Sequence, residues 1–269
     1  VMSSSPAVLH PVSLVGAGPG AADLLTLRAL QRLQQADVVL YDLLVSPEIL
    51  ALLPDSCERI CVGKRSSQHT LPQQEINRLI VAQAQQARRV VRLKGGDPFI
   101  FGRGGEEMQE LAAAGIACEV VPAVTAATGA AAASGIPLTH RDHAQMVSFV
   151  TGHRRMDDGC ASLDWIRLLG PESTLVIYMG LGEATRIAAE LMEHGAHAAD
   201  TPMAIVSCAT TPQQHIVRTT LGALPQALQD ERLVSPALLI IGSVTTLHEE
   251  LYPLICQAQA MRLEALASE

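Results

Sequence analysis

VSLVGAGPGA, which spans Val12–Ala21, joins a short apolar run of β-type residues to a turn with three glycines. A run of this length is typical of a buried strand, and the glycines allow the backbone to turn sharply and to approach a ligand. A helical pattern follows at Leu24–Gln35, and a second apolar run follows at Asp37–Tyr41. Strand, glycine turn, helix and strand in this order predict an α/β fold with largely parallel strands.

The same alternation continues along the chain. The apolar runs predict further strands at Arg59–Val62, Arg89–Leu93, Glu119–Val121, Met146–Thr151, Thr174–Met179, Met203–Ser207, Ile216–Thr220 and Ala237–Val244. Helical patterns lie at Pro47–Leu53, Gln73–Gln86, Glu106–Ala114, Ala123–Ala133, Glu183–His194 and Leu221–Gln229. The regular spacing of these elements extends the α/β prediction to the whole chain.

A polar segment, Thr139–Gln145, interrupts the alternation and precedes a fresh strand. We place a domain boundary in this segment, because polar stretches after Gly and Pro are typical of connections. The predicted organisation is a flexible tail at 1–10, an N-terminal α/β domain at 11–143, a C-terminal α/β domain at 144–256 and a C-terminal tail at 257–269.

The composition argues against several classes of function. The net charge of -8 predicts no general attraction to nucleic acid or to anionic membranes. Aromatic residues make up 3% of the chain, which argues against stacking on single-stranded nucleic acid. No segment reaches membrane-spanning length without charge, and Val1–His10 lacks the pattern of a signal peptide. We therefore expect a cytoplasmic protein with neither a nucleic-acid nor a membrane partner.

The cysteines and histidines give no metal signature. Six cysteines are scattered along the chain, as expected for reduced thiols. Cys57 and Cys61 resemble half of a zinc site, but no second pair has a matching spacing, so no metal is expected. The cluster of His140, His143 and His153 is interpreted as polar loop residues rather than a metal site or proton relay.

The first glycine loop admits a dinucleotide interpretation. Gly16–Ala21 fits the pattern G-x-G-x-x-G/A, and Asp42 ends the next strand, where a ribose-binding acid would lie. Pro19 weakens this interpretation, because it has no N–H for a pyrophosphate. An NAD(P)-dependent oxidoreductase and a tight turn without a ligand remain open as alternatives.

A second glycine loop, RLKGGDPFIFGRGGEE at Arg92–Glu107, holds five glycines between Gly95 and Gly105. It follows a predicted strand, and open α/β sheets bind ligands at the carboxyl ends of their strands. The loop lacks the ending of a P-loop, so nucleotide hydrolysis is not expected. Glu106 and Glu107 fit the first turn of a helix, whereas Arg103 between glycines indicates an anionic or polar substrate. Two such loops at strand ends predict one shared cleft.

Six segments, in order, resemble the uroporphyrinogen-III C-methyltransferases. They are LVGAGPG at 14–20, VLYD at 39–42, VGKR at 62–65, the second glycine loop, GIPLTHR at 135–141 and YMG at 178–180. The resemblance implies the tetrapyrrole methylase fold, with two α/β domains, an active-site cleft between them and a homodimer. It implies S-adenosylmethionine-dependent methylation of uroporphyrinogen III at two pyrrole carbons, giving precorrin-2 through precorrin-1, with S-adenosylhomocysteine as the second product.

The resemblance also assigns site residues. The S-adenosylmethionine site would be lined by Pro19, Gly95, Gly96, Asp97, Ile100, Thr125, Ala126, Met179 and Ala209. Acid/base or substrate-handling roles would fall on Asp42, Lys64, Arg103, Glu106 and Arg141. Two positions depart from the family pattern: Ala209 replaces a frequent glycine, which affects one close backbone contact, and Leu43 replaces a frequent arginine, which removes one substrate contact.

The proposed chemistry suits these residue types. A sulfonium is a cation, so backbone carbonyls and an acid such as Asp97 suit it better than a cradle of N–H groups. A tetrapyrrole with many carboxylate arms needs local cations, and the candidates are Lys64, Arg65, Arg103, Arg141, Arg154 and Arg155. Arg103 and Arg141 are expected to anchor these arms. An arginine does not lose its proton, so Arg103 is expected to orient and stabilise charge rather than act as the base.

Two further alternatives stay open. A related methyltransferase acting on a later corrin intermediate shares the fold, and a non-catalytic ligand-binding module is possible in principle, although the joint presence of Asp97, Arg103 and Glu106 argues against it. The methylase-like region begins near Val12, so no dehydrogenase or chelatase module is expected ahead of it. Whether the product enters sirohaem, cobalamin or haem d1 formation is left open.

Overall fold

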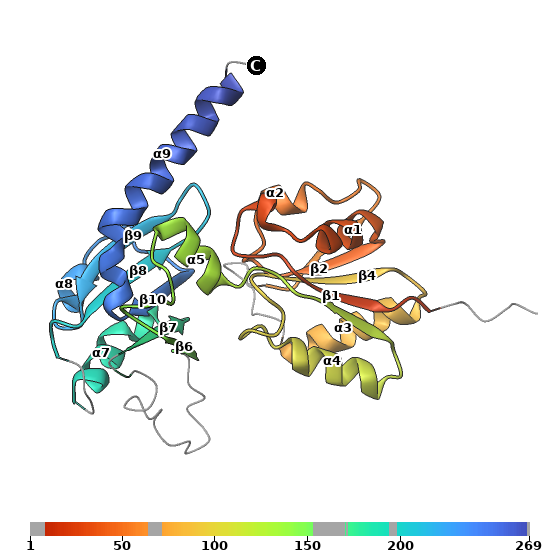
Figure 1. Cartoon of the computed structure of the whole chain (residues 1–269). Coiled ribbons are helices and arrows are strands. Elements are labelled where there is room, and N and C mark those ends of the chain that lie inside the picture. The colour runs from red at the N-terminus through yellow and green to blue at the C-terminus, as the bar shows by residue number, and fades with distance from the viewer. Residues whose placement is uncertain (1–8, 64–71, 153–169, 171, 194–197, 268–269) are drawn as a thin grey trace, which may run out of the picture. The chain divides into compact units, whose positions relative to one another are not determined.

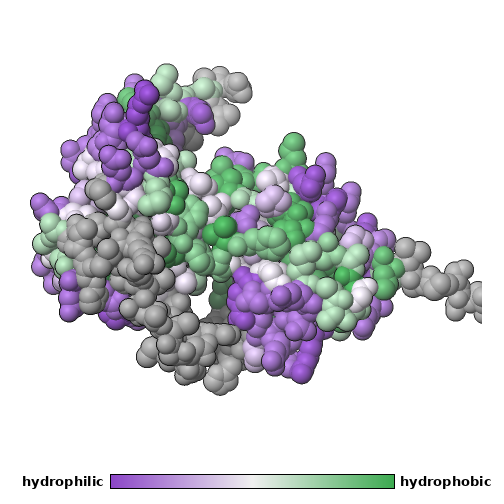
Figure 2. Space-filling model, turned by 60° about the horizontal axis from the view of Figure 1, so that its bottom comes forward, coloured by the Kyte–Doolittle hydropathy of each residue, from purple (hydrophilic) through white to green (hydrophobic). Residues whose placement is uncertain are grey.

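The computed structural model describes residues 9–63, 72–152, 170, 172–193 and 198–267. The chain divides into two compact units, Val1–Ala126 and Ala127–Glu269, and each contains one five-stranded sheet (Figure 1). Among the described residues, no helix is both long enough and apolar enough to cross a membrane. Figure 2 shows both hydrophilic and hydrophobic residues on the visible face of each unit.

The first unit contains a fully parallel sheet, as predicted. Its strand order is β3-β2-β4-β1-β5. The strands are β1 (Val12–Gly16), β2 (Val38–Tyr41), β3 (Glu58–Cys61), β4 (Val90–Lys94) and β5 (Cys118–Val121). The helical elements are η1 (Ala22–Leu24), α1 (Leu27–Gln35), α2 (Pro47–Leu50), α3 (Gln73–Gln85) and α4 (Gly104–Ala113). All the strands therefore end at one edge, which the loops of this unit occupy.

Helices cover both faces of this sheet (Figure 1). On one face, α1 and α2 pack against a core that includes Val91 and Leu93 of β4. On the other face, α3 and α4 pack against a core that includes Val90. Side chains alternate along a strand, so Arg92 and Lys94 share the face of Val90. The α3/α4 face is therefore apolar where β4 begins and charged where it ends.

The second unit contains a mixed sheet of order β6-β7-β10-β8-β9. The strands are β6 (Met146–Thr151), β7 (Ser173–Tyr178), β8 (Pro202–Ser207), β9 (His215–Thr220) and β10 (Ala237–Ile241). Only the β6–β7 pair is parallel. The prediction of largely parallel strands is therefore wrong for this unit. The reason is that β10 enters between β7 and β8 in the opposite direction, and β9 returns directly alongside β8.

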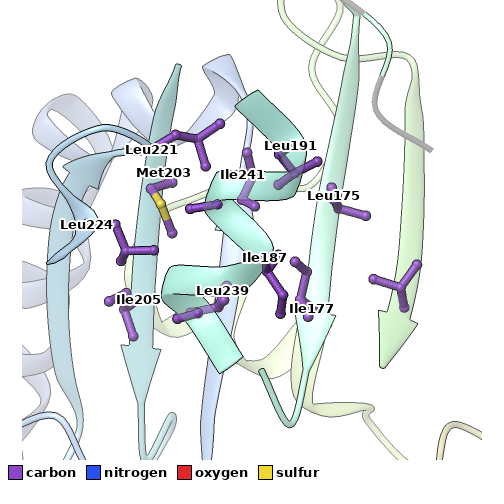
Figure 3. Close-up of a cluster of buried hydrophobic side chains, with 13 residues drawn as sticks. Leu175, Ile177, Ile187, Leu191, Met203, Ile205, Leu221, Leu224, Leu239 and Ile241 are labelled. Carbon is purple, nitrogen blue, oxygen red and sulfur yellow. The ribbon is translucent and has the colours of Figure 1, made fainter. Parts of the chain in front are cut away.

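Helix α7 (Ala184–Glu193) supplies the main core of the second unit (Figure 3). Ile187 and Leu191 pack among Ile177, Leu239 and other buried side chains of the sheet. Helix α8 (Leu224–Ala227) adds Leu224 to the same cluster. The other helical elements of the unit are η2 (Leu181–Glu183), η3 (Ser243–Leu247) and α9 (His248–Ala267). The α9 helix continues without a break through the predicted start of a tail at 257.

Helix α5 (Ala126–Ser134) belongs almost entirely to the second unit, whereas the sequence placed it in the first domain. The Ala127 N–H donates to the Tyr178 hydroxyl at 3.1 Å, and the Gln214 side chain donates to the Ala133 carbonyl at 3.1 Å. The division after 126 thus differs from the predicted limit at 143/144. The polar segment is a compact turn ahead of β6, in which His140 and Ala144 exchange backbone hydrogen bonds at 2.9 Å.

An ion pair joins the starts of β2 and β4. The backbone N–H of Arg89 donates to Asp37 Oδ2 at 2.8 Å, and its Nη2 donates to Oδ1 at 2.6 Å. The hydrogen bonds of the Arg89 side chain and then of its backbone lower the pKa of Asp37 from 3.8 to about 2. A lowered folded-state pKa stabilises the fold above the unfolded value, and this contribution is lost as the pH falls through the folded value.

We expect Asp37→Asn to lower the urea midpoint of unfolding at neutral pH. The difference from the wild type should shrink as the pH falls from about 4 to about 2, because the wild-type carboxylate is then protonated. Arg89→Met serves as the partner variant and should show the same pH dependence. A difference that stays constant across this window would contradict the assignment.

Candidate functional site

The two glycine loops are joined at the carboxyl edge of the parallel sheet. β1 and β4 are neighbours, so the loops that leave them start side by side. The Ala17 N–H donates to the Lys94 carbonyl at 2.7 Å, and Gly18 and Gly96 exchange backbone hydrogen bonds at 3.2 and 2.8 Å. Gly18 and Gly96 have φ values of 77° and 67°, which favour glycine. The structure thus brings both loops into one site, as predicted.

Asp97 connects these loops to the segment after β5. One carboxylate oxygen accepts the Ala123 N–H at 2.9 Å, and the other accepts the Phe99 N–H at 2.8 Å. Gly16 makes this junction possible, because a Cβ there would lie 2.5 Å from the Ala123 Cβ and 2.7 Å from the Gly96 carbonyl oxygen. Three loops, from β1, β4 and β5, therefore form a single packed unit.

The geometry argues against the dinucleotide interpretation of Gly16–Ala21. The N–H groups of Ala17 and Gly18 donate to backbone carbonyls, so they do not form a cradle for a pyrophosphate. The glycines are followed by the short η1 turn, and α1 begins only at Leu27, with Thr26 as its N-cap. The helix amino terminus that a dinucleotide site needs is thus not at the end of the loop.

The second loop holds Arg103 in a restrained backbone conformation. The Gly104 N–H donates to the Pro98 carbonyl at 3.0 Å, which folds the loop back on itself. Arg103 itself has a φ of 60°, a region that non-glycine residues seldom adopt and that is often found at functional sites. Its Nε donates to Glu106 Oε1 at 3.2 Å, and both side chains are about half exposed. The pair is therefore held by the loop and open to a ligand.

Asp42 lies directly after β2 at the same edge. Its Oδ1 accepts the Leu44 N–H at 3.0 Å, and its Oδ2 lies 3.8 Å from Nη2 of Arg92. The turn packs on the end of β4, because a Cβ on Gly95 would lie 2.5 Å from the Leu44 Cβ. The side chain of Asp42 is 26% exposed, so a ligand can reach it.

The predicted residues of the second unit do not all lie together. Met179 follows β7 with a φ of 54° and is half exposed. Ala209 follows β8, and the strand register places it at the same end of the sheet as Met179. Arg141 is exposed in the turn before β6. The other predicted positions of the first unit, Pro19, Ile100, Thr125 and Ala126, lie in or beside the joined loops. Lys64, Arg65, His153, Arg154 and Arg155 lie outside the described residues.

A buried ion cluster, which the sequence pattern does not predict, lies under this edge. Arg92 and Lys94 of β4 and Glu107 of α4 are buried, and Glu107 Oε1 accepts from Arg92 Nε at 3.1 Å and from Lys94 Nζ at 2.9 Å. Burial and then the nearby Arg92 lower the pKa of Lys94, and Glu107 opposes them. The sequence pattern alone assigns Glu107 to the helix dipole. Charges at alternate positions of an apolar strand were the signal that could have revealed the cluster.

The chain is similar in sequence to a known family and to curated proteins. Residues 11–225 match the family described as Tetrapyrrole (Corrin/Porphyrin) Methylases. The siroheme synthase of Azotobacter vinelandii is 56% identical over 248 residues, which cover 92% of this chain and 53% of that protein. That of Sodalis glossinidius is 57% identical over 240 residues, which cover 89% and 50%. The chain thus spans about half the length of these curated relatives.

Solved structures agree with this likeness. The uroporphyrin-III-C-methyltransferase from Thermus thermophilus is 41% identical with a TM-score of 0.74, and the match covers 90% of this chain and 96% of that one. The form of that enzyme complexed with S-adenyl homocysteine is 40% identical with a TM-score of 0.73, over 87% of this chain and 93% of that one. The two-sheet architecture described above is therefore the one found in these methyltransferases.

The packing around Gly16 gives a direct test of the joined loops. We expect Gly16→Ala to lower the free energy of unfolding by about 1 to 3 kcal/mol, because the added methyl meets backbone and Ala123. Urea unfolding measures this change. Gly105→Ala is the matched control, because nothing lies within 4 Å of its Cβ position. It should leave stability unchanged or raise it slightly, and equal losses in both variants would contradict the predicted close packing.

Proposed function

Because the chain belongs to the tetrapyrrole (corrin/porphyrin) methylase family, we propose that it transfers methyl groups from S-adenosylmethionine to two pyrrole carbons of uroporphyrinogen III. The products are precorrin-2, formed through precorrin-1, and S-adenosylhomocysteine. The observation that carries the proposal is that hydrogen bonds of Gly18, Gly96 and Asp97 join the glycine loops. The half-exposed Arg103 lies on the second of these loops. The joined loops offer both a cofactor site and a cation for the substrate at the carboxyl edge of the parallel sheet.

The residues at this edge fit S-adenosylmethionine. Nothing lies within 4 Å of the Cβ position of Gly96, so its backbone is open to a close approach. Two loop amides are already used by carbonyls, and Pro19 has none, which suits a cofactor without phosphate. Asp97 adds a carboxylate near the cofactor's positive charge. We assign Pro19, Gly95, Gly96, Asp97, Ile100, Thr125 and Ala126 to this site, together with Met179 and Ala209 of the second unit.

Arg103 and Arg141 are the proposed anchors for the carboxylate arms of the substrate. A guanidinium can bind both oxygens of a carboxylate, and Arg103 is half exposed on a restrained loop. Several exposed apolar side chains offer contacts for the ring: Phe99 and Phe101 on the loop that holds Arg103, and Leu43 and Leu44 in the turn after β2. Glu106 limits the motion of Arg103 through their hydrogen bond.

Asp42 is the proposed base. When bound, the cofactor supplies an electrophilic methyl group; a new C–C bond forms, the C–S bond breaks, and the electron pair goes to sulfur. The methylated ring carries the positive charge and must then lose a proton. Asp42 offers a partly exposed carboxylate for that proton, whereas arginine cannot accept it. Lys64 is proposed to assist as a substrate-handling residue.

The setting of the enzyme is part of the same proposal. We propose that it acts as a cytoplasmic homodimer, and that its product enters sirohaem formation. The names of the siroheme synthase relatives support the pathway. Apolar side chains exposed on α9, Leu254 and Met261, offer a surface for a second subunit. Free thiols at Cys57, Cys61, Cys118, Cys208 and Cys256 suit a reducing compartment.

Anaerobic incubation with S-adenosylmethionine and enzymatically generated uroporphyrinogen III tests the activity. We expect a product with two added methyl groups by mass, and a rate about 10- to 100-fold lower in Arg103→Ala, as for the loss of one charged hydrogen bond.

Arg186→Ala is the matched control, because Arg186 of α7 also pairs with a glutamate three residues away, Glu183 of η2. It should keep the wild-type rate. Binding of S-adenosylhomocysteine without any methylation would sink uroporphyrinogen III as the substrate and leave the cofactor assignment standing.

A further inference from the structure

Strand β4 carries two cations where a buried strand normally carries apolar side chains. The side chains of Arg92 and Lys94 are only 4% exposed, and that of Glu107 on α4 is 0% exposed. Removing a charged group from water costs several kcal/mol unless it is well paired. The buried charges therefore lower the stability of the first unit, and valine at these positions would complete the apolar face. A use outside packing would explain why they are present.

Hydrogen bonds from two of its nitrogens hold the guanidinium of Arg92 in place. Its Nε donates to Glu107 Oε1 at 3.1 Å, and its Nη1 donates to the Leu93 carbonyl at 2.8 Å. These bonds fix the plane of the group and leave Nη2 directed at Asp42, 3.8 Å from its Oδ2. That separation is an ion pair without a direct hydrogen bond. Arg92 thus presents a fixed positive charge to Asp42.

The carboxylate of Asp42 is held from the other side. The Leu44 N–H binds its Oδ1, so Oδ2 alone faces the cation. The charged groups around Asp42 in the described residues are Arg92 and Lys94 of β4, with Glu107 of α4 behind them; the neighbouring α3 contributes the neutral Gln73, which donates to Glu107. Glu107 offers one negative charge to two cations. Asp42 is therefore the second anion of the cluster.

The two carboxylate oxygens of Glu107 differ in their contacts. Arg92, Lys94 and Gln73 all donate to Oε1, whereas Oε2 is buried and has no hydrogen-bond partner among the described residues. If the cluster served only to hold α4 against β4, both oxygens of Glu107 would be expected to accept hydrogen bonds. An unsatisfied buried oxygen costs about 1 to 3 kcal/mol of stability. The observed arrangement instead keeps Nη2 of Arg92 away from Glu107 and facing Asp42.

We propose that Arg92, held by Glu107, is a positioning residue that orients the carboxylate of Asp42 for proton removal. This inference rests on the proposed function, in which Asp42 accepts the proton from the methylated ring. Arg92 is buried and does not touch the substrate. Its effect therefore belongs to the rate of turnover and not to the affinity for either ligand.

Kinetics of Arg92→Met, Arg92→Lys and Glu107→Gln test the proposal. For Arg92→Met we expect kcat to fall about tenfold or more, a part of the 100- to 10,000-fold that a positioned base supplies. The KM for uroporphyrinogen III and the Kd for S-adenosylhomocysteine should stay within about twofold of wild type. Arg92→Lys keeps the charge and should recover part of the rate, while Glu107→Gln should lose rate because Arg92 is no longer held.

A double-mutant cycle separates positioning from simple stability. If Arg92 acts through Asp42, Arg92→Met should lower the single-turnover rate of the wild type but have little further effect in Asp42→Ala. Additive losses, or a loss of kcat that follows the loss of thermal stability across all the variants, would overturn the proposal. Arg32→Met is the matched control, because Arg32 pairs with Glu119 of β5 at the opposite end of the sheet.

The same cycle on urea unfolding tests the contact without substrate. We expect Arg92→Met and Asp42→Ala to be non-additive in their effects on stability, because each removes the partner of the other. Additive effects would overturn the contact whether or not the chain methylates uroporphyrinogen III. Full activity in Asp42→Ala would instead remove the base from the proposed function and the positioning role with it. If Arg92→Met does not fold, the Arg92→Lys and Glu107→Gln variants carry the test.

Discussion

The pair of backbone hydrogen bonds between Gly18 and Gly96 is the constraint on which the rest of the site depends. It is possible because β1 and β4 are parallel neighbours, although many residues separate them in the chain. Once these two loops are joined, Gly16 has no room for a side chain, and the segment after β5 can pack against both loops. Asp97 then closes the junction through its hydrogen bond with the Ala123 N–H. A backbone contact between two segments far apart in the chain thus sets the position of three loops.

The same hydrogen bonds select the chemistry of the ligand. An amide that donates to a carbonyl of the neighbouring loop is not available to a phosphate. The first loop therefore retains the glycine pattern of a dinucleotide site but has lost its donors, and η1 replaces the helix start that would have faced a pyrophosphate. A cofactor that carries a positive charge and no phosphate suits what remains. This explains how a familiar glycine spacing can serve a methyl donor instead of a nicotinamide dinucleotide.

Charge is distributed unevenly across the parallel sheet. The face under α3 and α4 is apolar for most of its length and ends in Arg92, Lys94 and Glu107. Buried ions of this kind weaken an apolar core, but the hydrogen bonds that they do make hold their neighbours in defined orientations. The parallel strands place this cluster beneath the carboxyl edge, where the glycine loops and Asp42 also lie. Rigidity is therefore concentrated where the proposed chemistry needs fixed groups.

Local sequence patterns determined a large part of this protein. Apolar runs and helical periodicity predicted the strands of both sheets, and the two glycine loops predicted the edge at which Asp97 and Arg103 lie. These features are local, since a run of a few residues sets its own dihedral preferences. The quoted motifs also carry the resemblance to the family.

Tertiary structure decided which elements became neighbours. The insertion of β10 between β7 and β8, and the packing of α5 with the second unit, depend on contacts between residues far apart in the chain. The ion cluster was invisible for the same reason: Arg92 reads as a strand residue and Glu107 as the first turn of a helix until the fold brings them together. Pairing is chosen by the free energy of the whole assembly, and a single sequence displays only the local terms.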